Sequence, residues 1–431
     1  LAAGIPGTPA ALVHLAENYG VLPLQQTLAP ASELAEQGFE VEEFYQKMAG
    51  WRLQALRDSI SASEIFLQDD DVPETGYRVR QPDLAKTLRH LAEKGFDGFY
   101  RGEVAERLVK GVRDNGGIWT EKDLSGYQVI ERPPVVFNYN NKKIISAALP
   151  SSGGVVMAQI FNILSAYDFK NLSQVKQKHL VIEAMRRAYQ QRAKYLGDSD
   201  FVTLNLEKLT SKVHAGRLAE DIDLNRASLS KGLVSAAEGQ DTTHFSIIDN
   251  EGNRVAATLS INYPFGSGFV PEDTGVLLND EMDDFSASPG VPNVYGLVGS
   301  QANAIEPGKR MLSSMSPTFV ESDKGIAILG TPGGSRIITM VTQAILAMED
   351  SLDPKQWVDL PRFHHQYLPD QVEYESGALT AEEIKQLTAM GHQLQQVDNP
   401  FGNMQAIYLD KKTGKVSAAS DGRGIGAAQV K

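Results

Sequence analysis

The 431-residue chain contains no cysteine, and basic residues are fewer than acidic ones. Without cysteine there can be no disulfide, thiolate nucleophile or cysteine metal ligand within it. Acidic residues exceed basic residues by 54 to 41, so the formal charge is -13 at pH 7. Because this charge opposes a phosphate backbone or an anionic lipid surface, we expect no nucleic acid partner.

Long apolar runs are also absent from the chain. No uninterrupted run approaches the ~18 to 20 apolar residues that cross a bilayer, so we expect no membrane span. No basic and apolar leader precedes Leu1, and we therefore expect no signal peptide within this chain.

Motifs of several enzyme classes are missing. The serine elbow G-x-S-x-G does not occur, which disfavours an α/β-hydrolase site. His364 and His365 lack the H-E-x-x-H spacing, so they are interpreted as core or surface histidines rather than zinc ligands. Two glycine-rich loops, 151–154 and 330–335, match neither the P-loop nor the dinucleotide-binding pattern. The acidic triplet 69–71 is interpreted as a solvated loop.

Helical spacing of apolar residues recurs along the chain. It predicts that the first third is mostly helical, with helices at 8–20, 41–59, 82–94 and 103–115. Further along it predicts helices at 154–167, 173–196, 335–349 and 381–390. The polar side of helix 173–196 is interpreted as a solvated face, formed by Arg186, Arg187, Gln190, Gln191 and Lys194.

Strand patterns begin after residue 134. A first hairpin is predicted over 135–148, with its turn at Asn140-Asn141, and a second over 243–261, with its turn at 249–253. A buried strand is predicted at 325–329, and short strands are predicted near the end of the chain. Together with the helices, these strands predict a layered α and β architecture.

The segment 223–241 is poor in large apolar residues and rich in Ser, Ala, Gly and Lys. This composition is typical of an exposed connector and would suit a cleavable joint. Thr242 follows directly, at the mouth of the strand that opens the second hairpin. Thr243 should face away from Thr242, because successive side chains of a strand point to opposite faces.

Several motifs, taken in order, resemble the gamma-glutamyltransferase family of N-terminal nucleophile hydrolases. They are Asp241-Thr242-Thr243-His244-Phe245-Ser246, Asn279-Asp280-Glu281-Met282-Asp283-Asp284-Phe285, Pro289-Gly290-Val291-Pro292-Asn293-Val294-Tyr295, Leu312-Ser313-Ser314-Met315-Ser316-Pro317-Thr318 and Gly333-Gly334-Ser335-Arg336. The likeness runs from Gly4-Ile5-Pro6-Gly7-Thr8 through 149–154 to 361–365, nearly the whole chain. Any one motif would be weak evidence, since two threonines opening a strand are common for their β propensity. The ordered set carries the resemblance.

The resemblance implies a precursor that cuts itself between Asp241 and Thr242. The products would be a large fragment, 1–241, and a small fragment, 242–431, which form one structural unit with a four-layer αββα sandwich of the α+β class. Cleavage would free an amine beside the Thr242 hydroxyl. Such an amine, with a reference pKa near ~7.7 to 8.0, can act as the base that activates this nucleophile.

The resemblance also implies the other catalytic groups. Gly333 and Gly334 would give backbone N–H groups to the oxyanion, which two glycines before a helix can do with little steric cover. A plain turn and helix cap is the alternative for this pair. Ser260 stands where many relatives have threonine, and its hydroxyl would orient the Thr242 hydroxyl.

Donor recognition follows from the same resemblance. Ser313 and Ser314 would bind the α-carboxylate of a γ-glutamyl donor, and the family places an arginine for this carboxylate upstream of Gly4. Because carboxylates favour a cationic ammonium, a second set would hold the donor's α-amino group. That second set is Asn262, Glu281 and Asp284. Tyr295, on a lid loop from 286 to 298, would close over the donor.

The implied activity is a γ-glutamyl transferase and hydrolase that acts on glutathione and related γ-glutamyl amides through an ester on Thr242. Water, an amino acid or a dipeptide would accept the γ-glutamyl group. No metal or organic cofactor is implied, and a periplasmic or secreted location is. One alternative is an acylase of the same superfamily that acts on a β-lactam side chain or on poly-γ-glutamate. Another is a binding protein that never matures.

Overall fold

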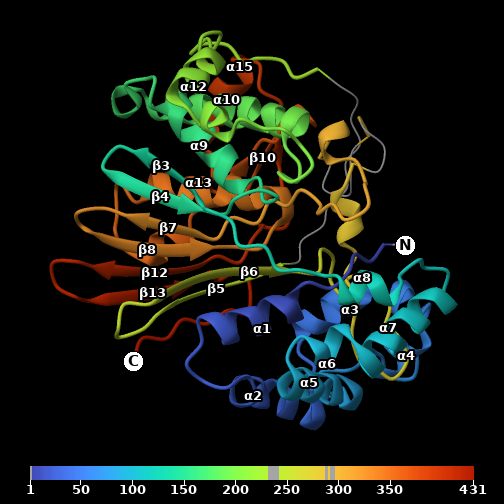
Figure 1. Ribbon diagram of the computed structural model, residues 1–431. Coiled ribbons are helices and arrows are strands. Elements are labelled where there is room, and N and C mark those ends of the chain that lie inside the picture. The colour runs from blue at the N-terminus through green and yellow to red at the C-terminus, as the bar shows by residue number, and fades with distance from the viewer. Residues whose placement is uncertain (1, 232–241, 287–289, 292–296) are drawn as a thin grey trace. The chain divides into compact units, whose positions relative to one another are not determined.

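The computed structural model divides the chain into two compact units (Figure 1). Unit 1 comprises residues 1–131 and 261–282, and unit 2 comprises 132–260 and 283–431. Asp241 and Tyr295, both assigned roles above, lie outside the described residues. The structure describes residues 2–231, 242–286, 290–291 and 297–431.

Unit 1 is mainly helical, as the spacing of its apolar residues predicted. Pro9 and Pro82 lie in the first turns of α1 and α5, where a missing N–H costs no helical hydrogen bond. One antiparallel pair, β1 (Phe39–Glu40) with β2 (Arg78–Val79), accompanies the helices. The helices are α1 (Thr8–Asn18), α2 (Leu24–Gln37), α3 (Glu43–Arg57), α4 (Ile60–Phe66), α5 (Pro82–Lys94), α6 (Asp97–Tyr100), α7 (Gly102–Asp114) and α8 (Glu121–Ser125). The four helices predicted in this region are α1, α3, α5 and α7, so those predictions are confirmed.

Unit 2 is built on a six-stranded antiparallel sheet with the order β13-β12-β8-β7-β4-β3. The predicted hairpin at 135–148 forms its β3 edge, and the predicted strand at 325–329 lies within it as the fully buried β8. The strands are β3 (Val135–Tyr139), β4 (Lys142–Ser146), β7 (Thr318–Glu321), β8 (Gly325–Gly330), β12 (Gln405–Asp410) and β13 (Val416–Ser420).

The two faces of this sheet have different neighbours (Figure 1). Helices α9 (Gly153–Leu164) and α13 (Ile337–Ala347) pack on one face, with α10 (Gln174–Tyr195) and α12 (Lys212–Ala219) against α9. The predicted second hairpin, β5 (Thr242–Ile248) with β6 (Arg254–Ser260), packs on the opposite face against β8 and β12. Within unit 2 the order of layers is therefore helices, large sheet, hairpin.

The remaining elements of unit 2 are short. Helix α15 (Ala381–Ala389) confirms the prediction at 381–390, and Thr380 with Glu383 forms its capping box. No helix in the described part of the chain has the length and apolar character needed to cross a membrane. The others are η1 (Phe169–Asn171), α11 (Leu206–Leu209), η2 (Glu281–Asp284, which spans the unit boundary), η3 (Gln301–Asn303), η4 (Gly334–Arg336), α14 (Pro354–Val358), β9 (Phe363–His364), β10 (Val372–Tyr374) and β11 (Leu394–Gln396).

The polar side of α10 corrects the sequence prediction of a solvated face. Gln190 and Lys194 are exposed, but Arg186 and Arg187 are each 5% exposed and Gln191 is 9% exposed. The charged pair is buried because Glu183, 0% exposed and one turn earlier, accepts hydrogen bonds from both guanidinium groups. Helical periodicity alone could not distinguish a polar stripe facing water from one facing buried carboxylates.

Candidate active site

Thr242 is the first residue of β5 and lies opposite Ser260, the last residue of β6. The antiparallel register makes them a cross-strand pair, so their side chains share one face of the hairpin. The Thr242 hydroxyl donates to Ser260 Oγ at 3.3 Å, and both side chains are half-buried. Thr243 is exposed, as predicted from strand alternation. The hairpin thus holds the Thr242 hydroxyl in a fixed orientation.

His244 follows Thr242 on the same face of β5 and is 5% exposed. Its ring shares hydrogen bonds with Thr258 Oγ1 at 2.8 Å and Ser246 Oγ at 3.1 Å. Burial lowers the pKa of His244 to about 4, so its ring is neutral at pH 7. A Cβ on Gly330 would lie 2.4 Å from this ring, which explains why β8 ends in glycine there.

Gly333 and Gly334 follow β8 and precede α13. Their φ angles are 137° and 55°, a region that side chains rarely adopt, and a Cβ on Gly333 would approach Met340 Cε to 2.5 Å. Within the described residues, no hydrogen bond occupies the N–H of either glycine. The loop therefore offers two backbone donors, and neither forms a hydrogen bond with the Thr242 hydroxyl among the described residues.

Ser313 and Ser314 are held by the segment that opens α9. The carbonyl of Ser313 accepts from Ser152 N at 2.8 Å and from Ser152 Oγ at 2.7 Å, while Ser313 N donates to Pro150 O at 2.8 Å. Ser313 Oγ accepts from Met315 N at 3.1 Å. The glycine-rich loop at 151–154 is therefore a brace for the two serines.

Arg192, on the last turn of α10, completes this brace and was not identified from the sequence. Its Nε donates to Ser152 Oγ at 2.9 Å and its Nη2 donates to Ser314 Oγ at 3.1 Å. Burial lowers the pKa of Arg192, while Tyr189 and Asp284 raise it; an arginine stays charged at pH 7 in either case. A signal was present, because Arg192 continues the buried stripe of Met185 and Tyr189 at helical spacing.

The hydroxyl hydrogens of the two serines follow from these contacts. Each Oγ accepts from a fixed donor, Met315 N or Arg192 Nη2, so each hydroxyl can turn its own hydrogen toward another acceptor. Among the described residues, neither hydroxyl donates to a protein acceptor. Two adjacent O–H donors beside a buried cation form a suitable site for a carboxylate.

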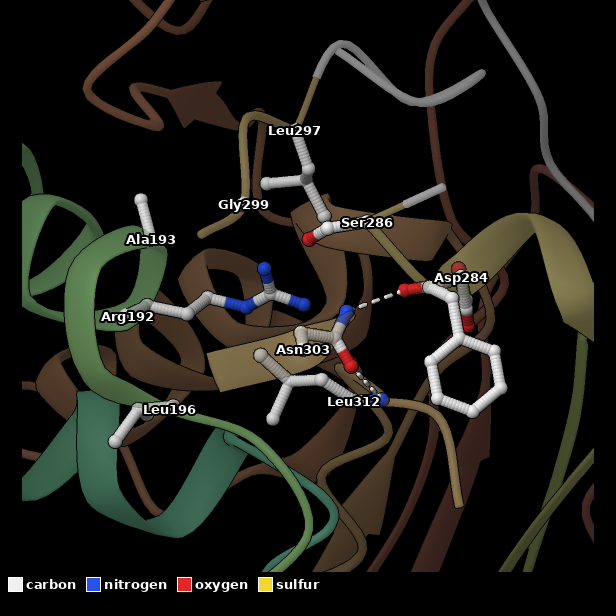
Figure 2. A pocket seen from close by; sticks show the side chains of 10 residues that line it. Arg192, Ala193, Leu196, Asp284, Ser286, Leu297, Gly299, Asn303 and Leu312 are labelled. Carbon is white, nitrogen blue, oxygen red and sulfur yellow. Dashed lines mark hydrogen bonds between the residues drawn. The ribbon is translucent and has the colours of Figure 1, made fainter. Parts of the chain in front are cut away.

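A small pocket lies beside Arg192, and Figure 2 shows the guanidinium pointing into it. Asp284 lies on the opposite side of the pocket, with Asn303 between them. Asn303 Nδ2 donates to Asp284 O at 2.7 Å, and Asn303 Oδ1 accepts from Leu312 N at 3.0 Å. Asn303 thus ties the Asp284 backbone to the segment that leads into the serine pair.

The other two predicted donor ligands belong to unit 1. Asn262 is 2% exposed, has a φ of 71°, and donates from Nδ2 to Asp280 O at 3.3 Å. Glu281 is half-buried, and its N–H donates to Asn279 Oδ1 at 3.0 Å. Within unit 1, Asn262 therefore lies next to Asp280, which directly precedes Glu281 in the chain.

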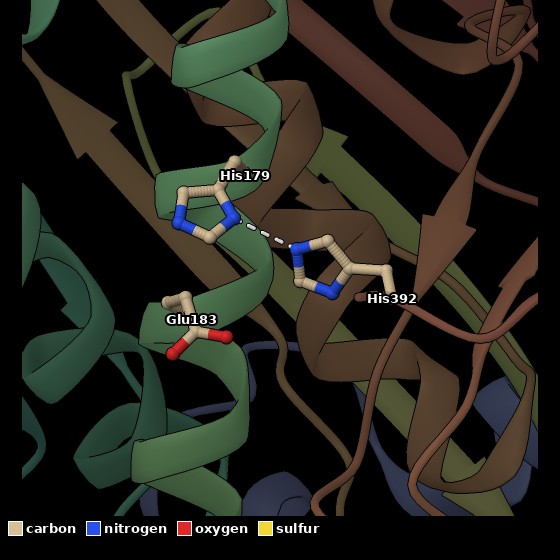
Figure 3. Close-up of side chains that lie close together, drawn as sticks. All are labelled: His179, Glu183 and His392. Atoms are coloured by element: carbon tan, nitrogen blue, oxygen red, sulfur yellow. Dashed lines mark hydrogen bonds between the residues drawn. The ribbon is translucent and has the colours of Figure 1, made fainter. Parts of the chain in front are cut away.

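Among the described residues of unit 2, His179, Glu183 and His392 form a group whose side chains lie close enough together to hold a metal (Figure 3). His179 Nε2 lies 2.9 Å from the carbonyl of Asp223, so it carries the hydrogen and leaves Nδ1 to accept from His392 Nε2 at 2.8 Å. The carboxylate of Glu183 is bonded to two arginines. These bonds engage the ring nitrogens of His179 and the carboxylate of Glu183, whereas Nδ1 of His392 is buried and has no hydrogen-bond partner among the described residues.

Comparison with known proteins identifies the family of this chain. The Gamma-glutamyltranspeptidase family profile matches residues 1–430. The chain belongs to the gamma-glutamyltranspeptidase family. It is 39% identical to the "Glutathione hydrolase proenzyme" of Escherichia coli, covering 99% of this chain and 74% of the relative. It is 43% identical to the protein of the same name from a Pseudomonas species, covering 95% and 72%.

A solved structure agrees with the predicted fold. The crystal structure of cephalosporin acylase from Bacillus halodurans superposes with a TM-score of 0.84 at 26% identity, covering 98% of this chain and 77% of that one. The fold is therefore the mixed α and β fold of the N-terminal nucleophile hydrolases, as predicted, and the chain is an enzyme of the gamma-glutamyltranspeptidase family. The relatives are named proenzymes, which fits a precursor cleaved into two fragments.

Proposed function

We propose that this enzyme cuts itself between Asp241 and Thr242 and then transfers or hydrolyses γ-glutamyl groups through Thr242. The observation that carries the proposal is the Thr242 hydroxyl, held by Ser260 at the first position of β5. In the cleavage step Thr242 Oγ attacks the carbonyl carbon of Asp241, the C–N bond breaks, and the proton passes to the freed amine. Water then hydrolyses the ester and releases the carboxylate of Asp241.

The freed amine of Thr242 becomes the base for the second reaction. Thr242 Oγ attacks the γ-carbonyl of the donor, the amine takes the hydroxyl proton, and the amide C–N bond breaks as that proton reaches the leaving amine. Gly333 and Gly334 donate to the oxyanion through their unoccupied N–H groups. Water, an amino acid or a dipeptide then accepts the γ-glutamyl group. His244 plays no part as a base, because burial lowers its pKa to about 4 and both ring nitrogens share hydrogen bonds with neighbouring hydroxyls.

Donor recognition is zwitterionic in this proposal. Ser313 and Ser314 bind the α-carboxylate, because both hydroxyls can donate to it. The α-amino group is held by two carboxylates and an amide, and Tyr295 covers the bound donor. These amino-group ligands are Asn262, Glu281 and Asp284. Glutathione is the donor named by the relatives, and we propose it and related γ-glutamyl amides here.

The two fragments, 1–241 and 242–431, remain one structural unit after cleavage. Support comes from the large sheet of unit 2, in which β4 of the first fragment pairs with β7 of the second. Separating the fragments would break this ladder and expose its buried faces. We also propose a periplasmic or secreted location, by resemblance to the family.

A β-lactam side-chain acylase is the second candidate, favoured by the similarity to cephalosporin acylase. Both candidates use Thr242, and they differ in the pocket for the donor. A glutaryl or similar acyl chain carries no α-amino group, so it would leave the carboxylates of Glu281 and Asp284 without a cationic partner. For this reason we favour a γ-glutamyl donor.

The test uses intact mass and turnover of a γ-glutamyl anilide, with Thr242→Ala as the variant and Thr243→Ala as its matched control on the exposed face of β5. Two fragments and turnover in the wild type and in T243A, with neither in T242A, would support both steps. Two fragments that release a glutaryl but no γ-glutamyl group would favour the acylase. An uncut and inactive wild type would instead indicate a binding protein.

A further inference from the structure

Arg192 stands out among the buried charges of unit 2 because its direct partners are hydroxyl groups. Its side chain is 5% exposed, and it reaches Ser152 and Ser314 across the end of α10. Burying a guanidinium is costly unless its charge is used or compensated. A structural brace between two serines could be made by a neutral side chain at lower cost. Burial lowers the pKa of Arg192 and the carboxylate of Asp284, which lines the same pocket, raises it. Because the direct hydrogen bonds of Arg192 nevertheless go to hydroxyl groups, its charge needs a further explanation.

The direction of the hydrogen bonds supplies one. Because Arg192 donates to Ser314 Oγ, the hydroxyl hydrogen of Ser314 is turned away from the guanidinium and toward other acceptors. A hydroxyl that accepts from a cation is also a stronger donor, since hydrogen bonds in a chain polarise one another. An anion bound by Ser314 would thus experience the charge of Arg192 without touching it.

The second bond fixes the position of the guanidinium. Ser152 Oγ accepts from Arg192 Nε and donates to Ser313 O at 2.7 Å. Arg192 is therefore linked to both adjacent serines, directly to the Ser314 hydroxyl and through Ser152 to the Ser313 carbonyl. The planar guanidinium can serve both serines together because its donors are set in a rigid fork, which a lysine ammonium does not have.

We propose that Arg192 is a positioning residue for the donor α-carboxylate, acting through Ser314. This inference rests on the proposed function, in which Ser313 and Ser314 bind that carboxylate. Arg192, in the last turn of α10, is then the cation that favours donors with an α-carboxylate over neutral analogues. It also gives the loop at 151–154 a role, because Ser152 of this loop links the guanidinium to the serine pair.

The experiment compares two anilide donors, the γ-glutamyl compound and its analogue with a carboxamide in place of the α-carboxylate. For Arg192→Met we expect KM for the carboxylate donor to rise about tenfold, the effect of losing a hydrogen bond to a charged group. KM for the carboxamide donor should change less than twofold by the same argument. Arg192→Lys should fall between the wild type and R192M.

Two controls separate positioning from general damage. Arg187→Met removes another buried arginine of α10 and should lower stability while leaving the ratio of the two KM values unchanged. In Ser314→Ala the carboxylate donor already loses its link to the cation, so adding R192M should cause little further rise in its KM. Equal rises for both donors, or fully additive effects in the double variant, would overturn the proposal.

A readout without turnover keeps the inference separate from the proposed function. We would measure the rise in Tm caused by L-glutamate and by its α-carboxamide in wild type, R192M, R192K and Ser152→Ala. A glutamate effect that depends on Arg192 supports the inference even if anilide turnover fails and the proposed function is rejected. A glutamate effect that survives in R192M and R192K overturns it. If R192M does not fold, the same comparison is made with R192K and S152A. A smaller rise in Tm with L-glutamate in these variants supports the inference, and an unchanged rise in both overturns it.

Discussion

Helix α10 carries buried arginines at two levels, and each level compensates their charge differently. In the middle of the helix Arg186 and Arg187 bond to the carboxylate of Glu183, and Arg186 also pairs with Asp370. At the end of the helix Arg192 bonds to hydroxyl groups. The first arrangement is a closed ion-pair network that can serve only structure. The second leaves the field of a cation available to a ligand.

Removing Glu183 should have the largest effect. Glu183→Ala leaves two buried guanidinium groups without their shared carboxylate, and breaking such a pair typically costs about 3 to 5 kcal/mol. Urea unfolding at pH 7 should show this loss, with KM of the folded fraction unchanged. Glu382→Ala, an exposed carboxylate on α15, is the control and should change stability by less than about 0.5 kcal/mol. A loss equal to that of the control would contradict the proposed difference between the two levels.

Acid should weaken the ion-pair network in a defined pH window. Hydrogen bonds from Ser228 N and the two arginines outweigh desolvation and lower the pKa of Glu183 from 4.5 to about 2. The unfolded chain therefore takes up this proton first, so the stabilisation is complete above pH 4.5 and is lost as pH falls toward 2. The linked loss amounts to up to about 3 kcal/mol. Between pH 5 and 3, the free energy of unfolding should fall more steeply with pH for the wild type than for Glu183→Gln.

His392 adds a separate window to the same measurement. Desolvation, with the nearby His179, lowers its pKa from 6.5 to about 3, so its ring is neutral in the folded state. The unfolded chain binds a proton at this ring below pH 6.5, and stability should decline as pH falls from 6.5 toward 3. Stability that stayed level between pH 7 and 5 would argue against this contribution.

The serine pair should affect binding more than stability. Ser313→Ala or Ser314→Ala removes one hydroxyl donor to the carboxylate, and each should raise KM for a γ-glutamyl anilide about tenfold. We expect kcat and Tm to change little, because the backbone bonds of the brace remain. A fall in kcat at constant KM would instead place these hydroxyls at the reacting atoms.

Lys194 should show the smallest effect. It lies two residues after Arg192 on the same helix but is exposed, with its ammonium 5.1 Å from the centre of the Tyr195 ring. Lys194→Met should change stability by less than about 0.5 kcal/mol and leave the ratio of KM values for carboxylate and carboxamide donors unchanged. A shift in that ratio would show that an exposed cation near the end of α10 also influences carboxylate binding. The contrast between Arg192 and the other cations of α10 would then be wrong.

Local patterns in the sequence were sufficient for the elements. The spacing of Leu84, Leu88 and Leu91 predicted α5, and the polar turn at Asn140-Asn141 predicted the β3-β4 hairpin. They also placed Thr242 at the start of a strand, with Thr243 on the opposite face. These features depend on interactions among residues close in the chain, which is why the sequence determined them by itself.

Tertiary structure alone decided which polar groups are buried together. Arg186 and Arg187 look like a solvated face in the sequence, yet their partner Asp370 lies 184 residues away from Arg186. Arg192 meets Ser314 across 122 residues, and Ser152 meets Ser313 across 161. Such contacts form because the sheet orders its strands as β8-β7-β4-β3 and brings distant segments to one end of α10. Helical periodicity and motif order do not reveal which distant residues come into contact. Only the folded chain could therefore show that a buried arginine is hydrogen-bonded to the serine pair.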